Sequence, residues 1–407
     1  MARSIIVGAG MVGLATAWHL QERGVEVTII DREGVAAGSS WGNAGWLAPA
    51  KTIPLADPSL WTYGPKALID PDAALHVPVR VDVNLWSFLA RFAAHGTQRA
   101  WDRAMAALTP IDRLALQSFD ELIDGGVESS THEGPFIIGF GHARHARGFM
   151  RDVAGVIQHG QSVHVERLDD PRALAPQLSS QIGAAYRMDG QRFIEPGPFM
   201  HALAESVTAR GAEMRMGLEV SAVDSSSRPS VMLSNGETLT ADSVVIATGA
   251  WMPRLARVLG VNVPVQAGRG YSFTVDTDEP AEHPVYLPTQ RIACTPYQGR
   301  FRIAGTMEFR GPDDALQHRR IQAIVNRVRT LMTGVDLDNR HDEWVGSRPV
   351  TPDGLPLVGQ TRAPNVYVAG GHGMWGVVLG PATGKLLAER IVTGRTDPAI
   401  APFDPLR

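Results

Sequence analysis

Apolar and glycine-rich stretches alternate at the start of the chain in the order strand, turn, helix, strand. Residues 5–7 are apolar, residues 8–13 contain three glycines, and residues 14–23 carry apolar and small side chains at helical spacing. Residues 25–30 form a second apolar run, which Asp31 closes. Two apolar strands joined by one helix predict a parallel pair, and parallel strands are typical of an α/β sheet.

Both periodicities return later in the chain. Between residues 85 and 123 apolar side chains recur at helical spacing, which favours helices that pack the core of a second domain. Residues 242–250 predict a buried strand of the first sheet, whereas residues 263–305 are rich in strands suited to an antiparallel sheet. The other expected elements are a strand at 134–140, a helix at 198–211, a helix at 321–332, a strand at 366–369 and a terminal helix at 380–392.

The turn at residues 8–13 has glycines at the three spacings of a dinucleotide-binding fingerprint. Gly8 allows a tight turn, Gly10 lets a pyrophosphate approach the backbone, and Gly13 lets the helix sit close to the sheet. Asp31 then stands where a carboxylate can bind a ribose diol. A purely structural turn is the weaker alternative, and the fingerprint does not separate FAD from NAD. The expected nucleotide contacts are Gly8, Ala9, Gly10, Met11, Val12, Gly13, Asp31 and Arg32.

A chain of 407 residues favours two domains. A glycine-rich passage followed by a proline-rich one, after residue 50, marks an exit from the first domain. We expect a nucleotide-binding domain made of residues 1–50, 165–250 and 340–407, and a substrate domain made of residues 51–164 and 251–339.

Composition narrows the classes of function. Apolar residues make up 44% of the chain and charged residues 20%, which is typical of a folded protein without spanning helices. A net charge of -4 with no basic segment argues against nucleic acid as a partner. The single cysteine, Cys294, excludes a multi-thiolate metal site, and we expect no metal. A start without a leader pattern favours the cytoplasm, and peripheral contact with the inner face of a membrane stays open.

Three segments carry a resemblance to a known family. They are GAGMVG at residues 8–13, SSWGNAGWLAP at 39–49, and WVGSRPVTPDGLPLVG at 344–359 followed by AGGHGMWGVVLGPATGK at 369–385. The chain resembles the FAD-dependent D-amino-acid oxidase and dehydrogenase family, closest to the bacterial D-amino-acid dehydrogenase small-subunit branch. This resemblance implies an α/β fold, with a Rossmann-type FAD-binding domain and a substrate domain of helices and a mostly antiparallel sheet.

The resemblance also implies where the flavin lies. The segment around residues 39–46 corresponds to the one that wraps the flavin ring and its ribityl chain, and the stretch 371–376 to the one along the pyrimidine edge. The N-terminal flavin segment contains neither Cys nor His, so we expect non-covalent FAD, with Cys294 in the core. The flavoprotein contacts implied are Ser39, Ser40, Asn43, Ala44, Gly45, Trp46, Val220, Thr248, Gly249, Gly371, Gly373, Met374, Trp375 and Gly376.

Arg348 corresponds to the arginine that binds the amino-acid carboxylate in this family. A guanidinium suits that role because its planar fork makes two parallel bonds to a carboxylate; a structural salt bridge is the alternative. Tyr271 is a candidate for lining the pocket or for the core, and His372 for a bond near the flavin or for packing. Ile292 stands where relatives carry a tyrosine, which leaves the side-chain pocket undefined.

The leading hypothesis is an FAD enzyme that oxidises the C–N bond of a small D-amino acid, or of a cyclic secondary amine such as D-hydroxyproline, to an imino acid by hydride transfer. The alternatives are a glycine- or sarcosine-type amine oxidase that uses oxygen, an NAD(P)-dependent dehydrogenase, and a subunit in which flavin is only structural. The expected partners are the amino-acid or amine substrate and an electron acceptor, which is a quinone, a carrier or oxygen.

Overall fold

A six-stranded sheet forms around the first strand of the chain. In the computed structural model, which describes residues 2–225 and 228–407, its order is β10-β2-β1-β14-β21-β20. All neighbours pair in parallel except β20 and β21, which are antiparallel. The strands are β10 (Glu213–Met216), β2 (Glu26–Asp31), β1 (Arg3–Val7), β14 (Ser243–Ile246), β21 (Val366–Gly370) and β20 (Leu357–Gln360).

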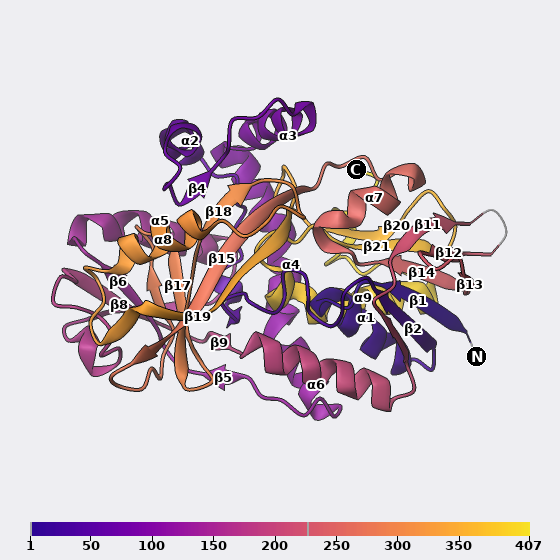
Figure 1. The fold of residues 1–407 in the computed structure, drawn as a ribbon, viewed down its shortest axis with the longest axis horizontal. Coiled ribbons are helices and arrows are strands. Elements are labelled where there is room, and N and C mark those ends of the chain that lie inside the picture. Colours follow the sequence, from indigo (N-terminus) through magenta and orange to yellow (C-terminus); the bar gives the residue numbers. More distant parts are fainter. Residues whose placement is uncertain (1, 226–227) are drawn as a thin grey trace.

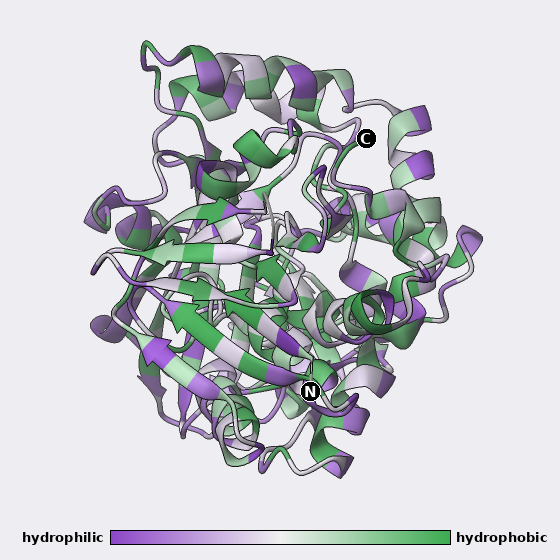
Figure 2. Ribbon diagram, turned by 90° about the vertical axis from the view of Figure 1, so that its right-hand side faces the viewer, coloured by the Kyte–Doolittle hydropathy of each residue, from purple (hydrophilic) through white to green (hydrophobic). Residues whose placement is uncertain are grey.

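Helices cover one face of this sheet and share its core. Leu14, Phe119, Phe199 and Leu387, one from each helix, lie in one buried apolar cluster. The helices are α1 (Met11–Gln21), α4 (Gln98–Asp124), α6 (Pro196–Ala209) and α9 (Gly376–Thr393). The other face is covered by α7 (Met252–Ala256) and by a small sheet of β11 (Val220–Asp224), β12 (Ser230–Leu233) and β13 (Thr238–Thr240). Figure 2, which faces this end of the molecule, shows strands that are largely hydrophobic along their length, as burial on both faces requires.

A second, nine-stranded sheet fills the other end of the molecule (Figure 1). Its order is β19-β15-β18-β17-β16-β6-β8-β7, with β4 beside β18, and only the pairs β16–β6 and β18–β4 are parallel. Helix α8 (His318–Val328) packs on one face. The strands are β19 (Val335–Val350), β15 (Gln266–Thr277), β18 (Arg300–Phe309), β17 (Ile292–Tyr297), β16 (Val285–Leu287), β6 (Phe136–Phe140), β8 (Ala184–Asp189), β7 (His164–Leu168) and β4 (Leu75–His76).

Three further pieces complete the fold. Helices α2 (Leu60–Ile69) and α3 (Val83–Ala94) stand at the upper edge of Figure 1, where Phe88 and Phe92 pack on Phe309 of the large sheet. Helix α5 (Ala146–Gln158) covers the outer strands. A small sheet of β3 (Trp46–Leu47), β9 (Arg192–Phe193) and β5 (His132–Glu133) lies where the two lobes meet.

The expected fold class is confirmed, and each element expected from periodicity has a counterpart. The expected boundaries need correction, because β7 and β8 join the large sheet although residue 165 was expected to open a segment of the nucleotide domain. Strand β19 likewise runs across the expected boundary at 340. Most of helix α4 packs in the core of the first sheet, where it contacts α9, whereas Trp101 and Met105 near its start pack with Val156 of α5. Helical spacing of apolar residues predicts that one face of the helix is buried, but it does not show which core buries that face.

Candidate active site

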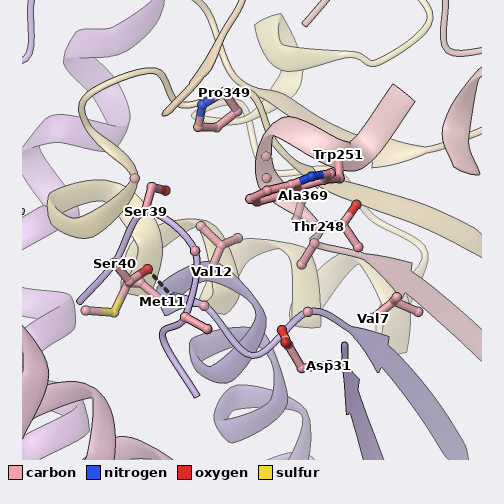
Figure 3. Close-up of a pocket in the computed structure, with 18 of the residues that line it drawn as sticks. Val7, Met11, Val12, Asp31, Ser39, Ser40, Thr248, Trp251, Pro349 and Ala369 are labelled. Atoms are coloured by element: carbon pink, nitrogen blue, oxygen red, sulfur yellow. Dashed lines mark hydrogen bonds between the residues drawn. The ribbon is translucent and has the colours of Figure 1, made fainter. Parts of the chain in front are cut away.

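A cavity opens at the carboxyl ends of the parallel strands, between the two sheets (Figure 3). It encloses about 1300 Å³ of space, a figure that includes open solvent at its mouth. The turn after β1, the residues after β2 and β14, and the last residues of β21 line one side, and Arg348 and Pro349 of β19 line the other. Ligands of open α/β sheets bind at this strand edge.

The turn between β1 and α1 leaves room for a ligand at one glycine only. Gly8 has φ +114°, and a Cβ there would lie 2.5 Å from the carbonyl oxygen of Ala247. A Cβ on Gly13 would lie 2.0 Å from the carbonyl oxygen of Gly8. A Cβ on Gly10 would meet only the hydroxyl of Ser40, at 3.4 Å, so the space beside Gly10 belongs to the cavity. The first amides of α1 face the same space, where a helix N-terminus stabilises anions.

The Asp31 carboxylate is fixed by backbone amides at the end of β2. One oxygen accepts from the amide of Ala9 at 2.9 Å, and the other accepts from the amides of Glu33 and Gly34 at 2.9 and 3.0 Å. An ionised carboxylate oxygen accepts two bonds, so the oxygen held by Ala9 keeps one free acceptor position on the cavity side. This is the geometry that a ribose hydroxyl needs.

Residues 39–46 form a loop, the cofactor loop, which hydrogen bonds from the large sheet hold in place. Ser272 donates to the carbonyl of Gly42 at 2.6 Å, and Thr295 donates to the carbonyl of Ala44 at 2.6 Å. The buried Arg302 donates to the carbonyl of Trp41 at 3.0 Å. These side chains lie more than 200 residues beyond the loop in the sequence, and sequence reasoning missed all three because nothing local marks them.

The Asn43 side chain hydrogen-bonds mainly to the backbone of its own loop. Asn43 accepts from the amide of Gly45 at 2.6 Å and donates to the carbonyl of Ser40. The Ser40 hydroxyl accepts from the amide of Met11 at 3.2 Å, which ties the loop to the start of α1 (Figure 3). Contacts of Asn43 with a ligand would therefore come from its backbone or from one face of the amide plane.

Arg348 lies between protein walls but faces the cavity. Its side chain keeps some accessible surface, and among residues 2–225 and 228–407 it has no hydrogen bond and no carboxylate within 4.0 Å. Burial lowers the pKa of the guanidinium to about 10, so Arg348 stays charged at neutral pH. A desolvated cation without a counter-ion is costly, and an anion in the cavity would relieve that cost.

His372 lies beside Arg348 at the start of the C-terminal segment. It is 2% exposed, and its Nε2 is 2.9 Å from the hydroxyl of Thr383 on α9. Burial lowers its pKa to about 4, so the ring is neutral at pH 7. Arg348 is therefore the cation of this part of the cavity.

Tyr271 does not reach the cavity, which corrects one of the two readings of this residue. Its ring is fully buried in the apolar cluster beneath α8, and its hydroxyl donates to Glu308. A register shift between Gly270 and Tyr271 helps to set this orientation, and the next residue, Ser272, faces the cofactor loop instead. Cys294 is buried in the same cluster as Tyr271, as expected for a core residue.

Asp313 connects the two lobes at the end of the cavity near Asp31. It accepts from Arg32 at 2.9 Å, from the Trp251 ring nitrogen at 2.8 Å and from Arg254 at 2.5 Å. The guanidinium of Arg32 also stacks on Trp251, 4.2 Å from the ring centre. Burial opposes ionisation of Asp313, but the three donors outweigh it and lower its pKa. Sequence reasoning found Arg32 but missed Trp251, Arg254 and Asp313.

Most residues expected to touch a cofactor do line the cavity. The expected residues on its wall are Gly8, Gly10, Met11, Val12, Asp31, Arg32, Ser39, Ser40, Asn43, Val220, Thr248, Gly249, Gly373, Met374 and Gly376, together with Arg348 and His372. Those set behind this wall are Ala9, Gly13, Ala44, Gly45, Trp46, Gly371 and Trp375. The Thr248 hydroxyl is buried with no hydrogen-bond partner among the described residues, which leaves it free for a ligand. Space at Gly10, a free acceptor on Asp31 and an isolated cation together fit an elongated dinucleotide with an anionic second ligand.

Comparisons with known proteins agree with this site. The family model described as "DAO: FAD dependent oxidoreductase" matches residues 3–390. A D-amino acid dehydrogenase of Methylobacterium nodulans is 30% identical over 99% of this chain and 97% of its own length, and one of Dechloromonas aromatica is 31% identical over 98% and 99%. Among solved structures, glycine oxidase from Geobacillus kaustophilus matches with a TM-score of 0.76 and 24% identity, covering 100% of this chain and 99% of the other.

Proposed function

The chain belongs to the FAD-dependent oxidoreductase family that these matches define, and from this membership we propose that it dehydrogenates a small amino acid at the carbon that bears the amine. FAD is the cofactor of the family, and the residues around the cavity fit it. The proposed substrate is a D-amino acid or a cyclic secondary amine such as D-hydroxyproline, and the proposed product is the imino acid. Non-covalent attachment is part of the proposal, because Cys294 lies in the core.

The isolated charge of Arg348 carries this proposal. A cavity that held only a dinucleotide would not need an unpaired guanidinium opposite the strand edge, whereas an amino acid brings a carboxylate that can pair with it. The NAD(P)-dependent alternative loses its support with the family assignment.

In the proposed mechanism the protein mainly positions the substrate. Arg348 binds the substrate carboxylate through its planar fork, which fixes the direction of the Cα–H bond. Bound FAD supplies the two-electron acceptor chemistry. His372, whose pKa burial lowers to about 4, is neutral at pH 7 and adds no second positive charge beside Arg348.

The electron acceptor and the cellular location form a finer part of the proposal. None of the helices in the described part of the chain combines the length and the apolar character needed to cross a bilayer. However, seven of the fourteen exposed large apolar side chains in the described residues lie between Trp61 and Trp86, on α2, α3 and their connection (Figure 1). Val81 is 106% exposed and Ile69 80%. Exposed tryptophans next to exposed aliphatic side chains and a lysine, here Lys66, are typical of a helix that binds the surface of a membrane.

We propose that a cytoplasmic protein makes a peripheral contact with the inner face of an anionic membrane through α2 and α3, and that a membrane quinone is its electron acceptor. Co-sedimentation of the holoenzyme with phosphatidylglycerol vesicles measures this contact. Binding should be lost in the Ile69→Asp, Val81→Asp double variant and retained in a Val258→Asp control, a site that is 83% exposed elsewhere. Equal binding of both variants would remove the membrane contact from the proposal.

An anaerobic screen of flavin bleaching tests the proposed activity itself. Yellow holoenzyme is mixed with D- and L-amino acids, glycine, sarcosine and hydroxyproline isomers, and the flavin absorbance is followed. Bleaching by a D-amino acid or D-hydroxyproline is expected, and bleaching only by glycine or sarcosine would favour the oxidase alternative. Re-oxidation with a quinone analogue and with oxygen then compares the acceptors. A flavin that no amine bleaches would contradict the proposed function.

A further inference from the structure

Another buried cation, Lys51, lies near the cofactor loop. Lys51 ends a short helical turn (Pro49–Lys51) directly after that loop and is 7% exposed. Among the described residues its ammonium has no hydrogen bond and no carboxylate within 4.0 Å; it lies over the rings of Phe149 and Tyr286, at 5.1 and 5.3 Å. Lysine is rarely buried without a partner, because desolvating the charge is costly.

Arg291 also has no carboxylate within 4.0 Å in the described chain. It directly precedes β17 with φ +55°, a conformation that is costly for a residue other than glycine. Its guanidinium lies 4.2 Å from the ring centre of Tyr63 and interacts with the buried hydroxyl of that residue, although outside ideal hydrogen-bond geometry. Strain of this kind is retained where a side chain must be aimed in one direction.

Strand alternation puts these groups on the side of the large sheet that faces the cofactor loop. Thr295 of β17 contacts the loop at Ala44, so Ala293, two residues earlier, shares its face. Tyr286 pairs with Ala293 and therefore also points to that side. Trp46 confirms the direction, because its ring packs on Tyr286 at 5.3 Å while its nitrogen donates to Thr295.

The register of strand pairing gives the position of Arg291 relative to Arg348 in the large sheet. The Arg348 guanidinium lies over Gly270 of β15, and Gly270 pairs with Met307 of β18. On the other side of β18, Ile292 of β17 pairs with Gly305. Arg291, the residue before Ile292, is therefore opposite the bulge between Gly305 and Met307 of β18. Two strand spacings of 4.7–4.9 Å place Arg291 about 10 Å from Gly270. Arg291 and the Arg348 guanidinium are therefore two strands apart in the large sheet.

The nearest acids do not neutralise the two cations by direct contact. Asp152 acts on both Lys51 and Arg291, and Asp57 acts on Arg291, but none of these pairs is within 4.0 Å. Asp152 is also exposed to solvent at its own position, whereas Lys51 is not. A purely structural cluster would be expected to close such ion pairs.

We propose that Lys51 and Arg291, with Tyr63 and Tyr286, form a second anion-binding subsite, and that the preferred substrate is an amino acid with a second acidic group, such as an amino dicarboxylate. The proposal rests on the proposed function, because Arg348 binds the carboxylate next to the amine. The second group of the substrate would complete the coordination of Lys51 and Arg291. It also accounts for the absence of a tyrosine at Ile292, since the neighbouring residue supplies a cation instead.

Calorimetric titration of the holoenzyme with redox-inert acids tests the subsite. The probes are glutarate and valerate, which have the same number of carbons but two carboxylates and one. The wild type should bind glutarate at least about tenfold more tightly than valerate, a modest gain for pairing a buried charge. Lys51→Met and Arg291→Gln should each reduce this ratio towards one. Lys66→Met, which removes a lysine that is 68% exposed on α2, should leave the ratio unchanged.

The outcomes separate this proposal from the proposed function. Equal affinity of the wild type for both acids, or an unchanged ratio in both variants, overturns the subsite. Glutarate preference that Lys51→Met or Arg291→Gln removes supports it, and either variant suffices if the other fails to fold. If neutral amino acids bleach the flavin but glutarate is not preferred, only the subsite is wrong. If glutarate is preferred but no amino acid bleaches the flavin, only the proposed function is wrong.

Discussion

The guanidinium of Arg348 occupies the space above Gly270 that any other residue would fill. A Cβ at residue 270 would lie 2.2 Å from both Cζ and Nη2 of Arg348. Gly270 pairs with Gly346 on the neighbouring strand, where a Cβ would instead lie 2.1 Å from the ring of Trp344. The position of the proposed carboxylate-binding group therefore depends on a residue with no side chain.

Gly270→Ala should displace Arg348 without removing the cofactor. We expect the KM for the substrate to rise at least about tenfold, since a misplaced charged contact costs a few kcal/mol, while FAD content stays that of the wild type. Steady-state kinetics and the flavin absorbance measure the two effects. Gly148→Ala is the matched control, because a Cβ there would meet nothing within 4 Å. Unchanged kinetics in Gly270→Ala would contradict the role of this contact.

Arg348→Ala should keep the flavin but lose most turnover of carboxylate substrates. Removing a charged bidentate contact costs about 2–5 kcal/mol, which lowers kcat/KM by about 30- to 5,000-fold. Arg348→Lys should recover part of the loss, because an ammonium restores the charge but not the planar fork. Comparison of kcat/KM for the three proteins decides this. Wild-type kinetics in Arg348→Ala would exclude Arg348 from the site.

Two glycines of the nucleotide turn should respond in different ways to the same substitution. Gly10→Ala should fold with near wild-type stability but bind FAD poorly, because its methyl group would enter the cavity. Gly13→Ala should instead destabilise the protein, since its Cβ would lie 2.0 Å from the Gly8 carbonyl oxygen. Thermal unfolding of the apoproteins and FAD titration separate the two effects. A Gly10→Ala protein that retains full FAD affinity would argue against a pyrophosphate at this glycine.

Protonation of His372 should make the protein less stable in mild acid. Its folded-state pKa of about 4 is below the ordinary value of 6.5, so the unfolded chain takes up the proton first as pH falls. The stability contribution is complete above pH 6.5 and is lost towards pH 4, with a limit of about 3 kcal/mol at 1.36 kcal/mol per pH unit. Urea unfolding at several pH values should show a smaller slope for His372→Gln than for the wild type. The same substitution at His201, which is exposed on α6, is the control.

Asp313 should strengthen FAD binding from the other lobe. It holds Arg32, Trp251 and Arg254, which line the cavity at the end near Asp31. We expect Asp313→Ala to raise the dissociation constant of FAD by about three- to tenfold, as loss of partly exposed charged hydrogen bonds allows. Fluorescence titration of the apoprotein measures it. Asp338→Ala, which removes an exposed ion pair with Arg329, should have no effect; equal losses in both variants would contradict the role of Asp313.

The parts of the site that the sequence predicted are contiguous in the chain. The turn at residues 8–13 and the acid at Asp31 could be found because strand, turn and helix follow one another directly, and backbone sterics alone require the glycines. Arg348 needed more than spacing, since its assignment came from the resemblance of a whole segment to a family.

Only the tertiary structure decided which residues surround the cofactor loop and which side chains share a face. Ser272, Thr295 and Arg302 support a loop more than 200 residues away, and Tyr271 turns into the core beside a register shift that no periodicity reveals. Lys51, on a helical turn, comes near the strand that Arg291 precedes because it lies over the ring of Tyr286, which pairs with Ala293 in the large sheet. Local sterics act between neighbours in sequence and can be read there, whereas strand register and lobe packing bring distant residues together and exist only in the folded chain.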